Sequence, residues 1–287
     1  MAIAEQEIAV PELTARKIKG YGWRPDLPDP RDRIFNLEEP VKRAAALPAS
    51  VDLSAKMPPI WNQGKLGACT GHGIARVLVY EALRQGETVP GLSADNAGYS
   101  RLFIYYGERS IEGTVGSDSG GQIRDGIKVV AKLGAPPEAD WPYSDADPGP
   151  FQKKPPASAF ADAVAHEALT YKRVLLGGPG APIRSALAAG YPVVFGFSVP
   201  QCFETGPWDA TRDPLPVPGP GEKMIGGHCV VITGYDFSRA RFAVPAFQID
   251  NSWGTGWGMG GRFWMDAAWF APHSHLVSDL WTITSVK

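Results

Sequence analysis

Apolar residues in the first half of the chain recur at helical spacing. The clearest case is CTGHGIARVLVYEALRQG, which begins at Cys69 and closes at Gly86, a residue type that often ends helices. Its apolar positions follow the helical period at Ile74, Val77, Leu78, Tyr80 and Leu83. Because these side chains lie on several sides of the helix, we expect the helix to be buried.

Two further helices are predicted downstream. The segment GQIRDGIKVVAKLG closes at Gly134. One stripe of this helix carries Ile123, Ile127, Val130 and Leu133. The segment ADNAGYSRLFIYYGER predicts another helix, with Leu92 before it and Ser93 as its N-terminal cap.

The second half of the chain is rich in strand-forming residues. After a proline-rich stretch at 142–156, six segments favour strands: ALTYKRVLL, YPVVFGFSVP, HCVVITGYD, AFQIDNSW, GRFWMD and SDLWTITSV. We therefore predict an α+β fold with a mainly helical lobe at 47–155 and a mainly β lobe at 156–287. The crevice between two such lobes is a usual place for a site.

The first 46 residues differ from the rest. They are rich in proline and charge, with GYGWRPDLPDPRD at their centre, and show no sustained period. We predict an extended strap. Proline lowers the entropy cost of ordering such a segment, so a strap carrying Trp23 and Pro25 is able to lie in the crevice and block it. The alternative is a tail packed on the β lobe away from the site.

Composition and charge narrow the class of protein. A chain of 287 residues with 44% hydrophobic content is long enough for a large core. With 28 basic and 30 acidic side chains, we expect neither nucleic acid nor a membrane surface as partner. Apolar runs such as YPVVFGFSV fall short of the roughly 18 residues of a membrane helix. The start, MAIAEQEIAV, lacks the pattern of a signal peptide, which fits a cytoplasmic protein or secretion by a leaderless or trimmed route.

One cysteine stands in a setting suited to chemistry. Cys69 lies in QGKLGACTG, at the predicted start of the buried helix. Unpaired backbone N–H groups at a helix start favour a thiolate, and small neighbours keep the sulfur approachable. The alternative is a small buried residue in a glycine turn. The chain has three cysteines, so at least one thiol is free, while Cys202 and Cys229 remain able to pair.

A histidine and an asparagine also occupy unusual settings. His228 follows two glycines at the head of the apolar strand in GGHCVVITGYD, and Asn251 ends another strand in IDNSWGTGWG. A cysteine and a histidine form a thiolate–imidazolium pair when a third group holds the ring, and the side-chain oxygen of Asn251 suits that task. Trp253 is placed to shield this hydrogen bond from water. The alternatives are a structural histidine and a turn asparagine.

The segments QGKLGAC, GGHCVVITGYD and NSWGTGWG, in this order, resemble the signatures of papain-like cysteine peptidases. The resemblance covers about residues 47–287 and implies a papain-like two-lobed fold, with a helical left lobe and an antiparallel, β-barrel-like right lobe. It implies that Cys69 is the nucleophile, His228 its acid/base partner, Asn251 the orienting group and Gln63 an oxyanion-hole donor.

The resemblance also implies positions that bind substrate. Gly120 and Gly121 match the double glycine whose backbone pairs with an extended peptide. Gly227 and Trp253 stand beside the predicted histidine and asparagine, and Cys229 falls near the second substrate subsite, which it is expected to narrow.

Three positions depart from the family pattern. Leu66 and Asp118 stand where many relatives have a disulfide-bonded cysteine pair, which weakens the case for an oxidising compartment. Thr70 replaces the usual tryptophan after the nucleophile. We expect Thr70 to change the packing near the prime side without removing a catalytic group.

The other histidines give weaker alternatives. His72 lies one helical turn after Cys69, but the resemblance assigns it a packing role. His273 and His275 alternate like residues on one strand face, and two histidines alone do not define a metal site. We predict no metal and no cofactor.

The residues and the resemblance together predict a monomeric thiol endopeptidase, made as a zymogen. It would hydrolyse peptide or protein substrates through an acyl-enzyme on Cys69. Two alternatives stay open: a transpeptidase or amidase with the same nucleophile, and a catalytically silent papain fold that binds peptides. A redox protein is disfavoured because no second cysteine lies near Cys69 in the sequence.

Overall fold

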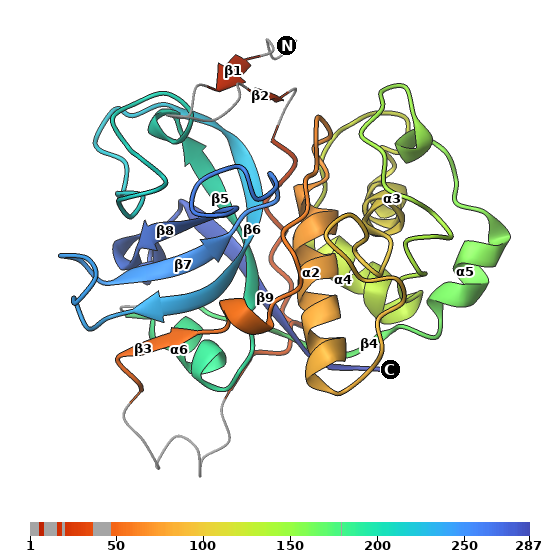
Figure 1. Cartoon of the computed structure of the whole chain (residues 1–287), viewed down its shortest axis with the longest axis horizontal. Coiled ribbons are helices and arrows are strands. Elements are labelled where there is room, and N and C mark those ends of the chain that lie inside the picture. The colour runs from red at the N-terminus through yellow and green to blue at the C-terminus, as the bar shows by residue number, and fades with distance from the viewer. Residues whose placement is uncertain (1–5, 9–15, 19–20, 37–46, 179) are drawn as a thin grey trace.

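Two lobes stand side by side in the computed structural model, which describes residues 6–8, 16–18, 21–36, 47–178 and 180–287 (Figure 1). The remaining residues of the predicted strap lie outside the described residues. One lobe is built from α2 (Cys69–Arg84), α3 (Arg101–Glu112), α4 (Ile123–Lys132) and α5 (Ala157–Ala163). The predicted α+β fold with two lobes is confirmed.

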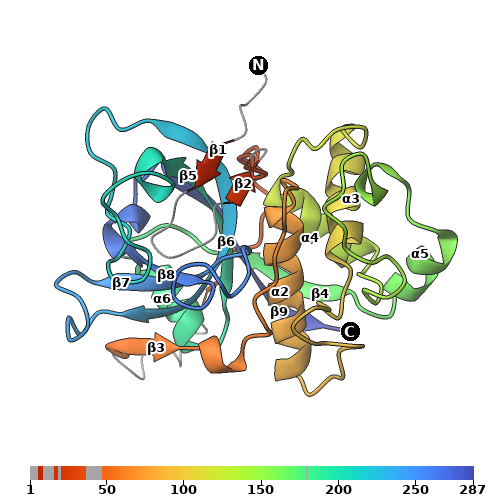
Figure 2. The ribbon, with the colours of Figure 1, turned by 45° about the horizontal axis from the view of Figure 1, so that its top comes forward.

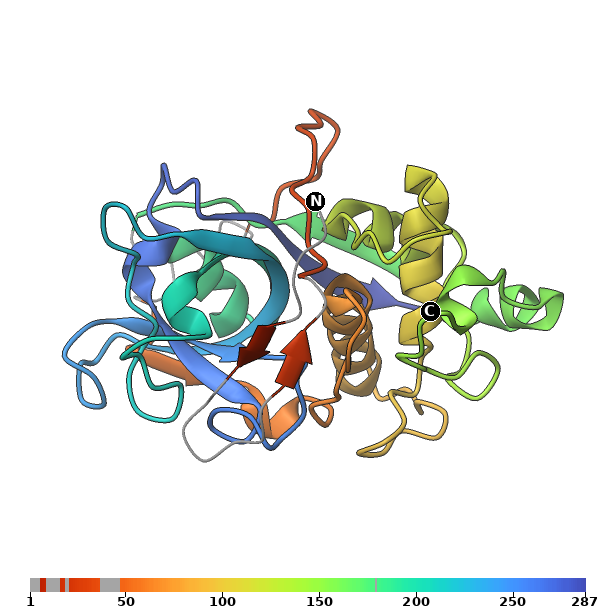
Figure 3. The same ribbon diagram turned by 90° about the horizontal axis from the view of Figure 1, so that it is seen from above.

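A seven-stranded antiparallel sheet forms the other lobe. Its order is β4-β9-β5-β6-β7-β8, and β3 pairs with β6 beside this path. The strands are β3 (Ser50–Asp52), β4 (Ala168–Arg173), β5 (Val193–Pro200), β6 (Met224–Asp236), β7 (Ala246–Asp250), β8 (Arg262–Asp266) and β9 (Val277–Val286). The sheet curves strongly, and β9 extends from it towards the helical lobe (Figure 3).

Several short elements complete the described chain. They are β1 (Gln6–Ile8), β2 (Arg16–Ile18), α6 (Ala181–Ala188) and the 3-10 turns Ser54–Lys56, Pro150–Gln152, Gln201–Phe203 and Ala267–Phe270. The strands β1 and β2 pair with each other in the strap. Neither this strand pair nor α5 and α6 was predicted from the sequence, because segments this short contain too few residues to show a helical or strand period of hydrophobic positions.

Two boundary predictions were wrong. The helix predicted from Ser93 begins at Arg101, where the hydroxyl of Ser100 accepts a hydrogen bond from the Phe103 N–H. Ser93 instead caps a turn, accepting from the N–H of Asn96. Leu133, expected on the buried stripe of α4, is 40% exposed because it follows the last helical residue.

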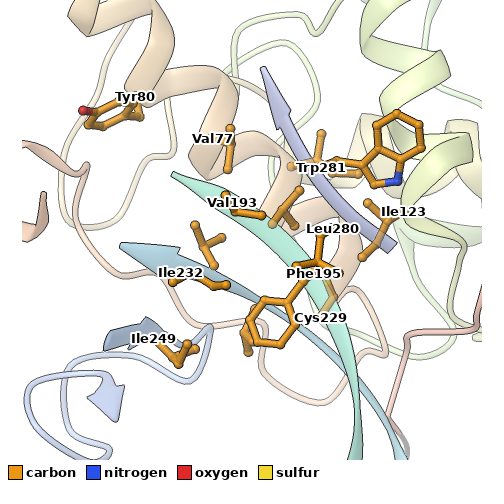
Figure 4. Close-up of a cluster of buried hydrophobic side chains, with 14 of the residues drawn as sticks. Val77, Tyr80, Ile123, Val193, Phe195, Cys229, Ile232, Ile249, Leu280 and Trp281 are labelled. Carbon is orange, nitrogen blue, oxygen red and sulfur yellow. The ribbon is translucent and has the colours of Figure 1, made fainter. Parts of the chain in front are cut away.

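The helix α2 lies between α3 and the sheet, and two glycines permit this close packing. A Cβ on Gly71 would come within 2.6 Å of the Arg101 carbonyl oxygen, and one on Gly73 within 3.0 Å of Cys229 Sγ. Val77 of α2 faces apolar side chains of the sheet such as Val193 (Figure 4). The start of α2, with Cys69, is therefore held against β6.

A buried ion pair also ties α2 to the sheet. The Arg76 guanidinium donates to Asp250 Oδ2 from Nε at 3.0 Å and Nη2 at 2.6 Å. Asp250 Oδ1 accepts from the Thr233 hydroxyl at 3.1 Å and from Arg262 Nε at 2.8 Å. Asp250 immediately precedes Asn251, so this pair positions the end of β7 relative to α2.

Arg76→Gln is expected to lower the free energy of unfolding by about 3 kcal/mol, because it leaves the buried Asp250 carboxylate with one cation fewer. Urea denaturation measures the loss. Arg212→Gln is the matched control, since Arg212 pairs with Asp209 at the surface, and it should change stability by no more than about 0.5 kcal/mol. Equal effects of the two substitutions would contradict a special role of the Arg76–Asp250 pair.

Candidate active site

Cys69 is the first residue of α2 and is fully buried. Its sulfur accepts a hydrogen bond from the Cys229 N–H at 3.4 Å. Cys229 directly follows His228 in β6, so the sulfur lies against the strand that carries the histidine. The sulfur also accepts a hydrogen bond from the backbone N–H of Gly22 in the strap. Figure 2 shows the strap, drawn in red, passing between β6 and the start of α2.

The strap changes the expected ionisation of the thiol. Burial raises the pKa of Cys69 to about 12, although the N–H groups of Cys229 and Gly22 oppose this rise. The nearby Glu108 carboxyl adds to the rise in pKa. Burial of the sulfur therefore works against the thiolate that the helix start favours.

His228 and Asn251 lie in contact, although His228 is inside β6 and not at the head of that strand as predicted, whereas Asn251 directly follows β7. His228 Nε2 lies 2.8 Å from Asn251 Oδ1, and both side chains are buried. An amide oxygen only accepts hydrogen bonds, so Nε2 carries the proton. The Ser252 N–H donates to the same oxygen at 2.8 Å and fixes its direction. The Trp253 ring stacks on the imidazole with centroids 5.1 Å apart and covers this hydrogen bond.

Gln63 is held rigidly beside these residues. Its Nε2 donates to the Leu66 carbonyl oxygen at 2.8 Å, and its Oε1 accepts from the Ser252 hydroxyl at 2.5 Å. The Tyr143 hydroxyl donates to the Gln63 carbonyl oxygen at 2.7 Å. An amide nitrogen has two N–H donors, so the second can point elsewhere. Ser252 thus links Gln63 to Asn251, a connection that the sequence analysis missed.

Two of the three departures from the family pattern, Asp118 and Thr70, form buried or part-buried hydrogen bonds. Asp118 accepts from the Gly67 N–H at 3.0 Å and from the Tyr105 hydroxyl at 2.5 Å, and so joins the two segments that a disulfide joins in many relatives. Thr70 is fully buried and donates to Glu108 Oε2 at 2.5 Å. Its side chain therefore faces α3, whereas we had expected an effect near the prime side.

Glu108 is a further buried group that the sequence analysis missed. Its side chain lies under the double glycine, since a Cβ on Gly121 would collide with it. Burial raises the pKa of Glu108 to about 8, so the carboxyl is largely protonated at neutral pH. Its charge therefore adds to the pKa of Cys69 only once Glu108 ionises, above neutral pH.

The predicted substrate-binding glycines contact the strap. The Gly121 N–H donates to the Gly22 carbonyl oxygen at 2.7 Å, and the Arg24 N–H donates to the Gly121 carbonyl oxygen at 3.1 Å. The Trp23 N–H donates to the Gly227 carbonyl oxygen at 2.9 Å. Gly120 has a φ of 69°, and a side chain there would overlap the backbone of Gly22. These glycines thus line a groove that an extended backbone occupies.

Tyr21 extends this contact to the predicted catalytic residues. Its ring lies edge-on to the His228 imidazole, with centroids 5.8 Å apart, and 6.4 Å from the Trp253 ring. Its hydroxyl donates to the Glu204 carboxylate. The described part of the strap therefore covers both the sulfur and the imidazole.

The other cysteines and His72 have structural surroundings. All three cysteines are free, so the alternative of a Cys202–Cys229 disulfide is wrong. The Cys229 sulfur lies near Gly73 of α2. His72 is buried, with its Nδ1 3.0 Å from the Ala68 carbonyl oxygen and its Nε2 3.2 Å from Arg101.

The two remaining histidines of the weaker alternatives lie at the surface. His273 and His275 are exposed in the loop before β9 and do not share a strand face as expected. Within the described ranges, no three His, Cys, Asp or Glu side chains are grouped to hold a metal ion. None of the described helices has the length and apolar character needed to cross a bilayer.

Known proteins share this architecture and sequence. The sequence pattern of the papain family cysteine proteases matches residues 47–270. An uncharacterized peptidase C1-like protein of Acanthamoeba polyphaga mimivirus is 32% identical over 93% of this chain and 88% of its own. The structure of xylellain, a cysteine protease from Xylella fastidiosa, superposes with a TM-score of 0.81 at 36% identity, covering 99% of this chain and all of that one. A procathepsin B from Trypanosoma congolense shares the fold, with a TM-score of 0.67 at 16% identity over 92% of this chain and 87% of its own. The chain belongs to the papain family of cysteine peptidases.

Proposed function

We propose that this cysteine peptidase cleaves peptide bonds with Cys69 as nucleophile, His228 as acid and base, Asn251 as the orienting group and Gln63 as an oxyanion donor. The observation that carries the proposal is the 2.8 Å contact between His228 Nε2 and Asn251 Oδ1 beside the buried sulfur of Cys69. A ring held in this way presents its other nitrogen to a thiol.

The reaction would proceed in two steps. The Cys69 sulfur attacks the substrate carbonyl carbon, and its proton passes through the His228 imidazole to the leaving amine as the C–N bond breaks. The product is a thioester on Cys69. His228 then takes a proton from water, whose oxygen attacks the thioester, and the sulfur leaves with the proton restored. The Cys69 N–H and the second amide N–H of Gln63 would stabilise the oxyanion in both steps.

The strap would inhibit this site without being cut. Gly22 offers its N–H to the sulfur of Cys69, while its carbonyl oxygen is bound by the Gly121 N–H. The nucleophile therefore faces a hydrogen-bond donor where a substrate must present a carbonyl carbon. Trp23 and Gly121 form a parallel bridge, which defines the direction in which the strap runs through the groove.

Glycine at position 22 is what permits this fit. A Cβ on Gly22 would overlap the Gly67 carbonyl group next to the nucleophile. A strap with any other residue there would have to move away from the thiol.

The retention of all four proposed catalytic groups argues against a silent peptide-binding module.

The function is tested with three forms of the protein. One is the full chain, the second is the same chain folded intact and then cut at a specific protease site inserted in 37–46, and the third is Cys69→Ala. We expect the cut chain to hydrolyse fluorogenic peptide amides faster than the full chain, and Cys69→Ala to lose activity by at least about a thousandfold. Cys202→Ala is the matched control and should remain active. Hydrolysis by Cys69→Ala would refute the nucleophile, and equal rates before and after cutting would refute the inhibition.

Inhibition by the strap should weaken as the pH rises. Burial and the adjacent charge of Asp279 raise the pKa of Asp26 in the strap from 3.8 to about 7, although Arg124 and the Trp281 N–H oppose the rise. The docked strap thus favours a protonated Asp26. Between pH 3.8 and 7 the released strap holds fewer protons than the docked one, so docking weakens by up to about tenfold per pH unit and then levels off.

Asp26→Asn should remove this pH dependence. The measurement is the activity ratio of full chain to cut chain from pH 4 to pH 8, which cancels the titration of the catalytic groups. The ratio is expected to rise with pH in the wild type and to stay flat in Asp26→Asn. An equal slope in both proteins would show that Asp26 does not govern release.

A further inference from the structure

The Trp23 side chain fills a closed pocket in the β lobe. The pocket walls are Gly196 of β5 and Gly227 of β6, and a Cβ on Gly227 would come within 2.7 Å of Trp23 Cε3. A Cβ on Gly196 would overlap the indole ring itself. Only 7% of Trp23 is exposed. Two glycines on neighbouring strands therefore leave a slot that accepts a flat ring.

Asp279 of β9 forms the floor of this slot. Its Oδ2 accepts from the Trp23 indole N–H at 3.2 Å and from the Asp26 N–H at 2.8 Å. The Asp279 side chain is 1% exposed. Its backbone has a φ of 57°, a left-handed conformation that is uncommon for residues other than glycine and costs energy inside a strand. A buried carboxylate in strained backbone, facing the slot, marks a position that serves function.

The charges around the Asp279 carboxylate determine whether it favours a neutral or a cationic hydrogen-bond donor. Arg173 Nη2 lies 3.5 Å from Asp279 Oδ1, and Arg173 Nη1 lies 2.7 Å from Asp32 of the strap. Arg124 also pairs with Asp32, at 2.5 Å. When the strap leaves, Arg173 loses Asp32 and keeps its contact with Asp279. The Asp279 carboxylate is then balanced by a cation already present, which disfavours a second cation from a substrate.

A substrate in the groove reaches the same slot. Trp23 follows directly after Gly22, which contacts the sulfur of Cys69, and it bridges to Gly121. A peptide that pairs with Gly121 beside the thiol would therefore place a side chain over Asp279 once Trp23 has left. Without an N–H donor from that side chain, the desolvated carboxylate loses a hydrogen bond.

Resting on the peptidase function proposed above, we propose that this slot selects substrates with a tryptophan-type side chain near the scissile bond, a flat aromatic group that carries a neutral N–H donor. The two glycines provide the shape, and Asp279 provides the acceptor. The strap then acts as a substrate mimic in this one side chain.

The test compares side chains that differ by one donor. The cut chain is assayed with fluorogenic peptide amides that carry tryptophan, 3-benzothienylalanine or arginine, placed in turn at the first and second residues before the scissile bond. Benzothienylalanine has the shape of tryptophan with sulfur in place of N–H. At one of these positions kcat/KM should be about 10- to 100-fold higher for tryptophan than for benzothienylalanine, the range expected for a hydrogen bond to a charged acceptor.

Asp279→Gly is the diagnostic variant, because glycine tolerates the left-handed backbone and removes the carboxylate. Its ratio of kcat/KM for the tryptophan peptide to kcat/KM for the benzothienylalanine peptide should fall to about twofold or less. An active wild type with equal rates for these two residues at both positions, or with a clear preference for arginine, would overturn the inference. The same result would leave the peptidase function intact.

A binding measurement separates the two proposals. The same peptides, without the fluorophore, are titrated calorimetrically into the cut Cys69→Ala chain. If no peptide is hydrolysed by the wild type, the peptidase proposal fails, but tighter binding of the tryptophan peptide would still support the slot. Equal affinities for tryptophan and benzothienylalanine peptides would refute it.

Discussion

The packing of α2 against the curved sheet is the constraint on which the rest of the structure depends. Cys69 stands at the start of this helix, whereas His228 and Asn251 belong to the sheet. Gly73 lets the helix approach β5 and β6, and the Arg76–Asp250 ion pair fixes its position along β7. A thiol and an imidazole that lie 159 sequence positions apart (228 − 69) are thereby held in one place.

The strap uses the same groove by ordinary backbone pairing. Gly22 reaches the thiol because it has no side chain, and Gly121 binds its carbonyl oxygen. Burial raises the pKa of Cys69 in this arrangement. We propose that the covered protein is inactive for two reasons: the strap fills the groove, and the buried nucleophile is protonated.

The sequence predicted the parts of the molecule that depend on local pattern. Periodic segments predicted α2, α4 and the strands β4 to β9. Glycine-rich surroundings singled out His228 and Asn251, although His228 lies inside β6 and not at its head. The contacts that the sequence did not predict join residues distant in sequence. They are the hydrogen bonds of Asp118 with Gly67, of Ser252 with Gln63 and of Asp279 with Trp23. The start of α3 was missed for a local reason, because Ser93 and Ser100 are both competent caps and the turn between them uses the first.

We propose that Cys69 is a nucleophile that is kept neutral under the strap. The most direct measurement is the rate at which iodoacetamide alkylates Cys69, followed by mass spectrometry of its peptide between pH 6 and 9, before and after the strap is cut. We expect slow alkylation of the intact chain throughout this range and a rate about 100-fold or more higher at pH 7 after cutting, because the rehydrated thiol forms a thiolate beside His228. Rapid alkylation of Cys69 in the intact chain, at the rate found after cutting, would contradict this proposal.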